Sequence, residues 1–163
     1  MVKRTSLSKA DCPVARSLDA IGDWWSLLIV RDAFDGLRRF GQFQESLGIS
    51  KGILAARLHD LVELDILRVA PVEGAAYQEY VLTDKGRDLF PVVVALRQWG
   101  EDHCFGAGEH HSTLLESATR QPVGRLKVHA RDGRELGWKD TVVRKIEPSR
   151  ANRTAARPKR GQR

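Results

Sequence analysis

The sequence predicts a mainly helical α+β protein, and three observations support this. Apolar residues recur at helical spacing in four segments of the first half of the chain and in a longer segment that follows Thr83. Two of the helical segments are separated only by the short connector Gly48-Ile49. Two short runs of β-branched and aromatic residues flank a turn at Gly74, which is typical of a β-hairpin. The expected order is therefore several helices, a hairpin and a long helix.

The size and composition of the chain fit one compact domain with appendages. The 163 residues are 42% hydrophobic, which is enough to bury a core. We expect a cytoplasmic protein with no membrane partner, because no apolar run resembles a membrane span or a signal peptide. The two cysteines, Cys12 and Cys104, are too few for a disulfide scaffold and are expected to be reduced thiols.

The formal net charge of +6 comes from the C-terminal end of the chain. Residues 148 to 163 contain six bases and no acid, so residues 1 to 147 carry 21 bases and 21 acids. A nucleic-acid surface on the neutral folded part must therefore come from the local arrangement of charges. We expect residues 148 to 163 to form a disordered basic tail and residues 1 to 10 to form a flexible N-terminus.

Capping residues indicate where the first helices begin. Asp11 is the expected N-cap of the first helix, Asp23 caps an apolar second helix, and Gly48 ends the third. Ser50 is the expected N-cap of a fourth helix. The inner apolar positions of that helix are Ile53, Leu54, Leu58, Leu61 and Val62. Two helices joined by so short a turn are typical of a helix-turn-helix, and the hairpin that follows would be its wing.

A long helix capped by Thr83 is expected to bend or to divide in two at Pro91. Its apolar stripe needs a partner, and the first helix carries a similar stripe. We expect the two stripes to form a homodimer interface, since a monomer would expose a large apolar patch. The expected interface residues are Val14, Leu18, Leu89, Val92, Val93, Leu96 and Trp99. The tryptophans expected in the core or in this interface are Trp24, Trp25 and Trp99.

The main domain is expected to span residues 11 to 105, followed by a small C-terminal β appendage at 106 to 147. The appendage contains short runs with β-branched residues, separated by expected turns at Pro122 and Gly133. The predicted fold class is therefore a mainly helical winged helix-turn-helix with helical dimerisation elements and a β-rich extension.

The outer face of the helix from Ser50 predicts a surface for double-stranded DNA, because an α-helix fits the major groove. Arg57 could bond a guanine edge or a phosphate, and the small Ala55 allows close approach to a base pair. The full predicted set is Arg38, Arg39, Ser50, Lys51, Gly52, Ala55, Arg57 and His59. The alternative for each of these residues is an ordinary solvated surface.

No enzyme, cofactor or metal site is expected. The chain contains no glycine-rich phosphate loop, no nucleophile elbow and no zinc-protease motif. A cluster at the end of the long helix does not have the spacing of a closed tetrahedral zinc site. Its members are His103, Cys104, His110 and His111.

Over residues 11 to 103 these motifs, in this order, resemble the HxlR family of bacterial regulators, relatives of the MarR group. The residues that carry the resemblance are Cys12, Pro13, Trp25, Leu27, Leu28, Arg31, Gly36, Arg39, Phe40, Gly48, Ile49, Ser50, Leu54, Arg57, Leu58, Leu61, Tyr80, Leu82, Thr83, Gly86, Trp99 and Gly100. The resemblance implies a winged-helix dimer, built from the first and last helices, that usually represses and sometimes activates transcription. It also implies a response to oxidants, electrophiles or a small-molecule effector in many members.

Cys12 is a candidate redox sensor on the same basis. The resemblance places a sensing thiol at this position in several family members, and a helix N-terminus favours the thiolate. The alternative is that Cys12 packs as a small apolar residue.

Two features depart from the family pattern. The wing, residues 73 to 79, has two acids and no base where family members commonly carry Arg or Lys, and the appendage lacks the cysteine pairs that hold a metal in some relatives. We expect a homodimeric repressor that places two helices from Ser50 in successive major grooves of an inverted-repeat operator. The alternative function is a winged-helix module for protein interaction or ligand sensing without specific DNA binding.

Overall fold

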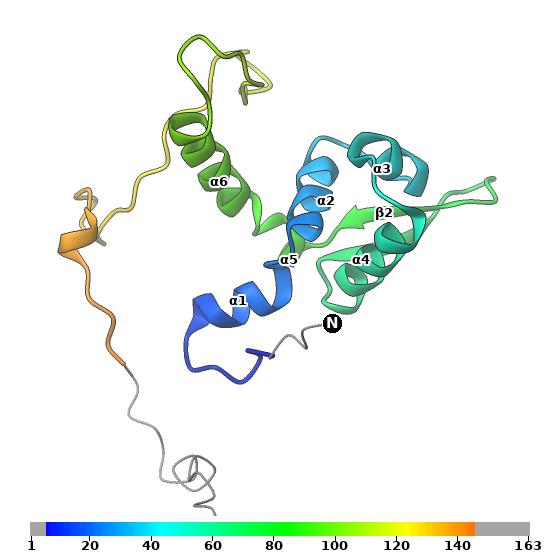
Figure 1. The fold of residues 1–163 in the computed structure, drawn as a ribbon, viewed down its shortest axis with the longest axis horizontal. Coiled ribbons are helices and arrows are strands. Elements are labelled where there is room, and N and C mark those ends of the chain that lie inside the picture. The colour runs from blue at the N-terminus through cyan, green and yellow to red at the C-terminus, as the bar shows by residue number, and fades with distance from the viewer. Residues whose placement is uncertain (1–5, 146–163) are drawn as a thin grey trace, which may run out of the picture. The chain divides into compact units, whose positions relative to one another are not determined.

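The computed structural model describes residues 6–145 and shows a helical body with one small sheet (Figure 1). The helices of the first half are α1 (Pro13–Ile21), α2 (Trp24–Phe34), α3 (Phe40–Leu47) and α4 (Lys51–Glu63). Strands β1 (Leu67–Pro71) and β2 (Gln78–Leu82) pair antiparallel, and α5 (Asp84–Arg87), α6 (Phe90–His103) and the 3-10 helix η1 (Trp138–Asp140) follow. The predicted winged helix-turn-helix class is confirmed. The predicted basic tail lies outside the described residues.

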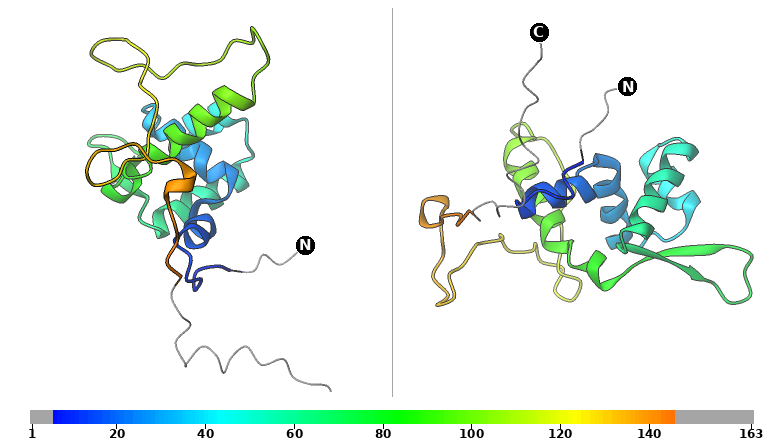
Figure 2. Two further views of the ribbon diagram at one scale, coloured as in Figure 1. Left: turned by 90° about the vertical axis from the view of Figure 1, so that its left-hand side faces the viewer. Right: turned by 90° about the horizontal axis from the view of Figure 1, so that it is seen from below.

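The core lies where α2, α3, α4 and the base of the hairpin meet. Leu54, Leu58 and Leu61 form the inner face of α4 and are completely buried, as are Ile29 of α2 and Phe43 of α3. Burying side chains of this size stabilises the folded state by about 1.5–3 kcal/mol each. The hairpin extends beyond α3 and α4, in the position of a wing (Figure 2).

The predicted helix ends are confirmed at the side chains that cap them. Asp23 Oδ1 accepts hydrogen bonds from the backbone N–H groups of the first turn of α2, Ser50 Oγ accepts from Ile53 N, and Thr83 Oγ1 accepts from Gly86 N. Gly48 ends α3 in the left-handed conformation, with φ of 61°, which a residue without Cβ adopts at no steric cost.

The predicted cap of the first helix is wrong. The N-cap of α1 is Cys12 rather than Asp11, and its side chain makes no capping hydrogen bond. Pro13 explains the shift, because proline at the first helical position has its φ already set for a helix and lacks the N–H that a cap would satisfy. Two residues that precede α1 contact it, since Ser6 Oγ and Leu7 N both donate to Asp19.

The long helix is divided near Pro91, as predicted, into α5 and α6. Proline lies in the first turn of α6, where the absence of its N–H costs no hydrogen bond. The turn of α5 lies directly against the hairpin: a Cβ on Gly86 would lie 2.1 Å from Ile66 O. This close approach requires glycine at residue 86.

The β strands predicted between residues 106 and 147 are absent from the described part of that segment. It contains only two isolated bridges, Leu115 with Pro122 and His129 with Glu135, and the 3-10 helix η1. A turn is present at Gly133, where φ is 86°. Each bridge joins a single pair of residues and does not extend into a ladder, so the local β propensity of these runs does not produce a strand.

Residues 112–126 are instead fastened to α6 by side chains. Arg97 Nη1 donates to Ser112 O at 2.9 Å, and the Gln98 amide donates to Gly124 O and accepts from Leu126 N, each at 2.9 Å. An ion pair joins α6 residue Asp102 to Arg125, and the hydrogen bond from Arg125 holds the pKa of the Asp102 carboxyl below its usual value. Internal contacts divide the chain after Leu126, so residues 106–126 group with the helical body.

Within residues 6–145, no helix combines the length and the apolar composition needed to cross a bilayer.

Helices α2 and α4 are also joined through one arginine. Arg57 Nε of α4 lies 3.2 Å from Asp23 Oδ1, and Arg57 Nη1 lies 2.8 Å from Asp60 Oδ2. The arginine side chain is 34% exposed, so water screens the pairs only in part. Asp23 therefore both caps α2 and holds the guanidinium of the neighbouring helix.

We predict that Arg57 and Asp23 are energetically coupled in the folded state. Arg57→Ala and Asp23→Asn each remove one charge, while asparagine keeps the ability to cap α2. A double-mutant cycle in urea should give a coupling of about 0.5–1 kcal/mol in the free energy of unfolding. Arg87→Ala, which removes an exposed arginine from α5, is the control and should change stability by less than about 0.5 kcal/mol. Additive effects of the two substitutions would show that the pair contributes nothing.

Candidate nucleic-acid interface

The outer face of α4 carries mostly small and polar side chains near its start. Ile53 was predicted to face inward, but it is 44% exposed. Ser50, Lys51, Gly52, Ala55 and His59 are all exposed. The burial of the opposite face fixes their direction, since residues on the two sides of a helix cannot both face the core. The first N–H groups of a helix also lack intrahelical partners and attract phosphate. The geometry thus suits a helix that enters a groove with its N-terminal half.

Arg57 differs from the other predicted residues of α4. It lies at the edge of the outer face, with its guanidinium between Asp23 and Asp60. A base contact by Arg57 would require at least one of these ion pairs to be given up. Its role at a base edge stays a prediction, whereas the sequence did not indicate the pairing with Asp23, because the two residues are adjacent only in the fold.

Arg38 and Arg39 lie on the loop that leads into α3 and are more than half exposed. Both face the wing: Arg38 Nη1 lies 3.7 Å from Glu79 Oε2, and Arg39 Nε lies 3.5 Å from Glu79 Oε1. The Arg39 guanidinium also lies over the ring of Tyr77, 4.3 Å from its centroid. Tyr80 N donates to Arg38 O at 2.8 Å and ties the loop to β2.

The acidic wing is therefore a partner of these two arginines. In the sequence these acids and arginines lie in separate segments, and no local pattern links them. Their opposite signs were the available signal, but Arg39 and Glu79 are 40 residues apart in the chain, and only the fold brings them together.

The predicted dimer interface divides into two groups. Leu89 and Val93 are partly buried and pack against the core of their own chain. The other five residues are exposed on α1 and α6: Val14, Leu18, Val92, Leu96 and Trp99. Among the aromatic residues, Trp25 packs against the core, while Trp24 is exposed and meets the Trp25 ring edge-on at 5.4 Å.

Both cysteines are free thiols on the surface. Cys12 lies at the N-cap of α1, and Cys104 lies at the C-cap of α6. Across the described residues there is no group of three or more His, Cys, Asp and Glu side chains that could hold a metal ion.

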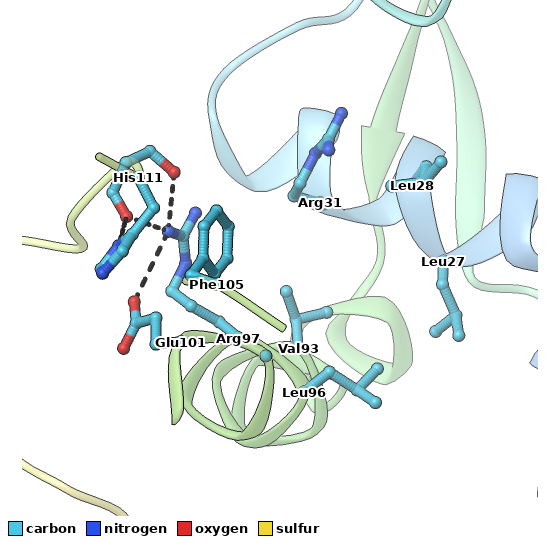
Figure 3. Close-up of a pocket in the computed structure, with 11 residues that line it drawn as sticks. Leu27, Leu28, Arg31, Val93, Leu96, Arg97, Glu101, Phe105 and His111 are labelled. Carbon is cyan, nitrogen blue, oxygen red and sulfur yellow. Dashed lines mark hydrogen bonds and ion pairs between the residues drawn. The ribbon is translucent and has the colours of Figure 1, made fainter. Parts of the chain in front are cut away.

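A cavity of about 280 Å³ lies between α2, α6 and the loop that follows α6 (Figure 3). Leu27 and Leu28 of α2 and Leu96 of α6 line it, and Leu27 points toward Leu96. Two arginines stand at its rim: Arg31, which pairs with Asp32 at 2.6 Å, and Arg97, which is held by Ser112 and lies 3.9 Å from Glu101. The cavity thus has an apolar floor and a rim whose charges are already paired.

Comparison with protein families gives one match to most of the helical body. Residues 20–106 match the model of the HxlR-like helix-turn-helix family. An HTH-type transcriptional regulator of unassigned role from Mycobacterium tuberculosis, MT3179, is 47% identical over 91 residues, which cover 55% of this chain and 58% of that protein. The chain thus spans less than two thirds of the length of this relative. YodB of Bacillus subtilis, an HTH-type transcriptional regulator, is 33% identical over 100 residues, covering 57% of this chain and 86% of YodB.

Solved structures of similar chains agree with this assignment. The crystal structure of PA1607, a candidate transcription factor, superposes with a TM-score of 0.84 and 58% identity, over 87% of this chain and all of that one. The redox regulator HypR in its reduced form superposes with a TM-score of 0.52 and 30% identity, over 57% of this chain and 94% of HypR. Fold, motif order and sequence similarity together show that this chain belongs to the HxlR-like helix-turn-helix family of transcriptional regulators.

Proposed function

We propose that this protein binds an inverted-repeat operator as a homodimer and represses transcription. The observation that carries the proposal is the exposed N-terminal half of α4, backed by three buried leucines and flanked by the wing. A two-fold dimer would place two such helices in successive major grooves, about 34 Å apart. The alternative, a winged-helix module without specific DNA binding, keeps the same fold and predicts no footprint.

The homodimer part of the proposal is supported by the exposed apolar stripes on α1 and α6. Leu96 and Trp99 of α6 and Leu18 of α1 are each more than half exposed. A stripe of this kind on a single chain is typical of an interface. In an isologous dimer the same two helices of each protomer meet those of the other, which gives the two-fold symmetry that an inverted repeat requires.

The DNA part of the proposal rests on local charge. Residues 6–126 carry thirteen bases and seventeen acids, so the helical body as a whole repels DNA. Lys51 at the start of α4, with Arg38 and Arg39 beside α3, supplies the positive charge of the proposed surface, and Glu79 opposes it. We infer that Lys51 contacts phosphate and that Glu79 weakens binding.

Lys51→Ala should weaken binding to DNA by about 3- to 10-fold and by a similar factor on all sequences, because a lysine on phosphate does not distinguish bases. Titration of fluorescent promoter DNA of the protein's own gene and of scrambled DNA at several salt concentrations measures this. The slope of log K against log salt should fall by about one. Lys9→Ala removes the same charge before α1 and should leave both values unchanged. A footprint that is absent for the wild-type dimer would instead favour the alternative function.

Glu79→Gln should strengthen DNA binding at low salt by about 3- to 10-fold, because it removes one negative charge and frees two arginines for phosphate. The gain should shrink at high salt, where exposed charges are screened. Glu73→Gln is the matched control, since Glu73 is an exposed acid on the same wing. Weaker binding by Glu79→Gln would show that Glu79 instead positions the arginines for contact with DNA.

The effector part of the proposal has two candidate locations. Cys12 is an exposed thiol at the start of a helix proposed to form the dimer, and the similar protein HypR has been solved in reduced and oxidised forms. A small-molecule effector would fit the cavity between α2 and α6, because ligands there touch both the helix that supports α4 and a proposed dimer helix. Either event would act by changing the spacing of the two α4 helices.

Treatment with diamide should lower operator affinity of the wild type by at least about tenfold and leave Cys12→Ser unchanged, if Cys12 is the sensor. Operator titration before and after treatment measures the effect. Cys104→Ser, treated in parallel, shows whether Cys104 is the second thiol. Release of DNA in both the wild type and Cys12→Ser, or in neither, would contradict the role of Cys12.

A further inference from the structure

Residues 127–145 are the described part of the second unit, and we call this segment the arm. The arm has almost no interior of its own. Only Ala130 and Leu136 in the arm are half-buried, and every other residue in it is exposed. The most exposed apolar side chains are Val128 at 65%, Trp138 and Val143 at 83%, and Val142 at 95%. Several highly exposed apolar side chains in one short segment are typical of a contact surface.

The arm nevertheless has a defined local conformation. Leu136 N donates to Val128 O at 2.8 Å, and Ala130 N donates to Arg134 O at 2.8 Å, which closes the turn at Gly133. Asp140 Oδ2 accepts from Gly137 N at 2.8 Å at the start of η1. A few exposed hydrogen bonds cannot offset the entropy lost in ordering so many residues. A chain segment of this kind therefore needs a surface to pack against.

The structural similarity to PA1607 extends beyond the helical body into the arm. Residues 1–126 are less than four fifths of the chain, whereas the superposition covers 87% of it. The match must therefore continue into the arm. HypR superposes over only 57% of this chain, so the match to HypR is too short to include both the body and the arm.

We propose that the arm packs against the helical body of a second copy of this chain, so that each protomer of the dimer clasps the other. The inference rests on the homodimer proposed above and goes beyond it by assigning a role to the arm. The arm carries six bases and three acids, a charge of +3, while residues 6–126 carry −4. The helical body of the second copy thus has a net charge opposite to that of the arm, and it has exposed apolar side chains of its own.

The size of the arm fits this role. The arm has 19 residues, and each partner of a stable protein interface contributes about 20–30 residues. Because donor segment and acceptor surface belong to the same chain, a two-fold dimer makes the contact twice and closes without exposing a further arm. DNA is the other acidic partner that the charge would allow. Trp138, Val142 and Val143 favour protein, because the phosphate backbone is bound through charge rather than through aliphatic side chains.

The test uses the full-length chain and measures self-association without DNA. In sedimentation experiments over a dilution series, Trp138→Ala and the double variant Val142→Asp/Val143→Asp should raise the dimer dissociation constant at least about tenfold. Ser117→Ala, which trims an exposed neutral side chain outside the arm, is the control and should stay within about twofold. Circular dichroism of the monomeric variants should match that of diluted wild type, because these side chains are exposed in the single chain.

Fluorescence then identifies the surface that covers the arm. The difference spectrum between wild type and Trp138→Phe reports on Trp138 alone. Its emission should lie at short wavelength in the dimer and move to the red on dilution. A short-wavelength emission that does not change on dilution would overturn the proposal by showing that the arm packs on its own chain. Unchanged dissociation constants in the arm variants would also overturn it.

Three further outcomes separate this proposal from the proposed function. Arm variants that dimerise normally but bind DNA more weakly, with a smaller salt slope, would overturn the proposal in favour of an arm that contacts nucleic acid. A wild-type chain that is monomeric at all concentrations would overturn both the arm and the homodimer. A wild-type dimer that depends on the arm but gives no footprint would support the proposed role of the arm and refute the proposed binding to an operator.

Discussion

The burial of the inner face of α4 is the constraint on which the rest of the molecule depends. Leu54, Leu58 and Leu61 have no contact with solvent, and they pack among residues of α2 and α3. Rotation of α4 about its axis would expose these leucines, so the burial also fixes which residues face outward. The pairing of Arg57 with Asp23 adds a polar connection between the same helices. The candidate DNA surface is thus a consequence of how the core is filled.

Electrostatics around this surface act in two directions. Lys51, Arg38 and Arg39 provide local positive charge, while the body that carries them has more acids than bases. Glu79 lies within 4 Å of both arginines and reduces the charge they present to a ligand. Phosphate would have to compete with a carboxylate that is already in place. Such an arrangement disfavours indiscriminate binding to nucleic acid and leaves a larger share of affinity to contacts with bases.

The C-terminal part of the chain is not held by a buried apolar core, in contrast to the helical body. Residues 112–126 are held to α6 by side chains, through Arg97, Gln98 and Asp102, rather than by pairing of strands. The arm beyond Leu126 makes its own turn but buries almost nothing. Apolar runs separated by turns suggested a sheet there. A sheet needs neighbouring strands in register, and an apolar segment can equally bury its side chains against another surface.

Features set by a few neighbouring residues could be derived from the sequence alone. Caps at Asp23, Ser50 and Thr83, the left-handed Gly48 and the division at Pro91 all follow from hydrogen bonds and backbone preferences within one helical turn. The order of these elements was enough to predict the winged helix-turn-helix. Contacts between distant residues were decided only by the tertiary structure: the pairing of Asp23 with Arg57, the pairing of Glu79 with two arginines, and the attachment of residues 112–126 to α6. Each of these contacts joins charged or polar side chains, and each of those side chains could have paired with many other residues of the chain. The packing of the apolar core determines which side chains meet.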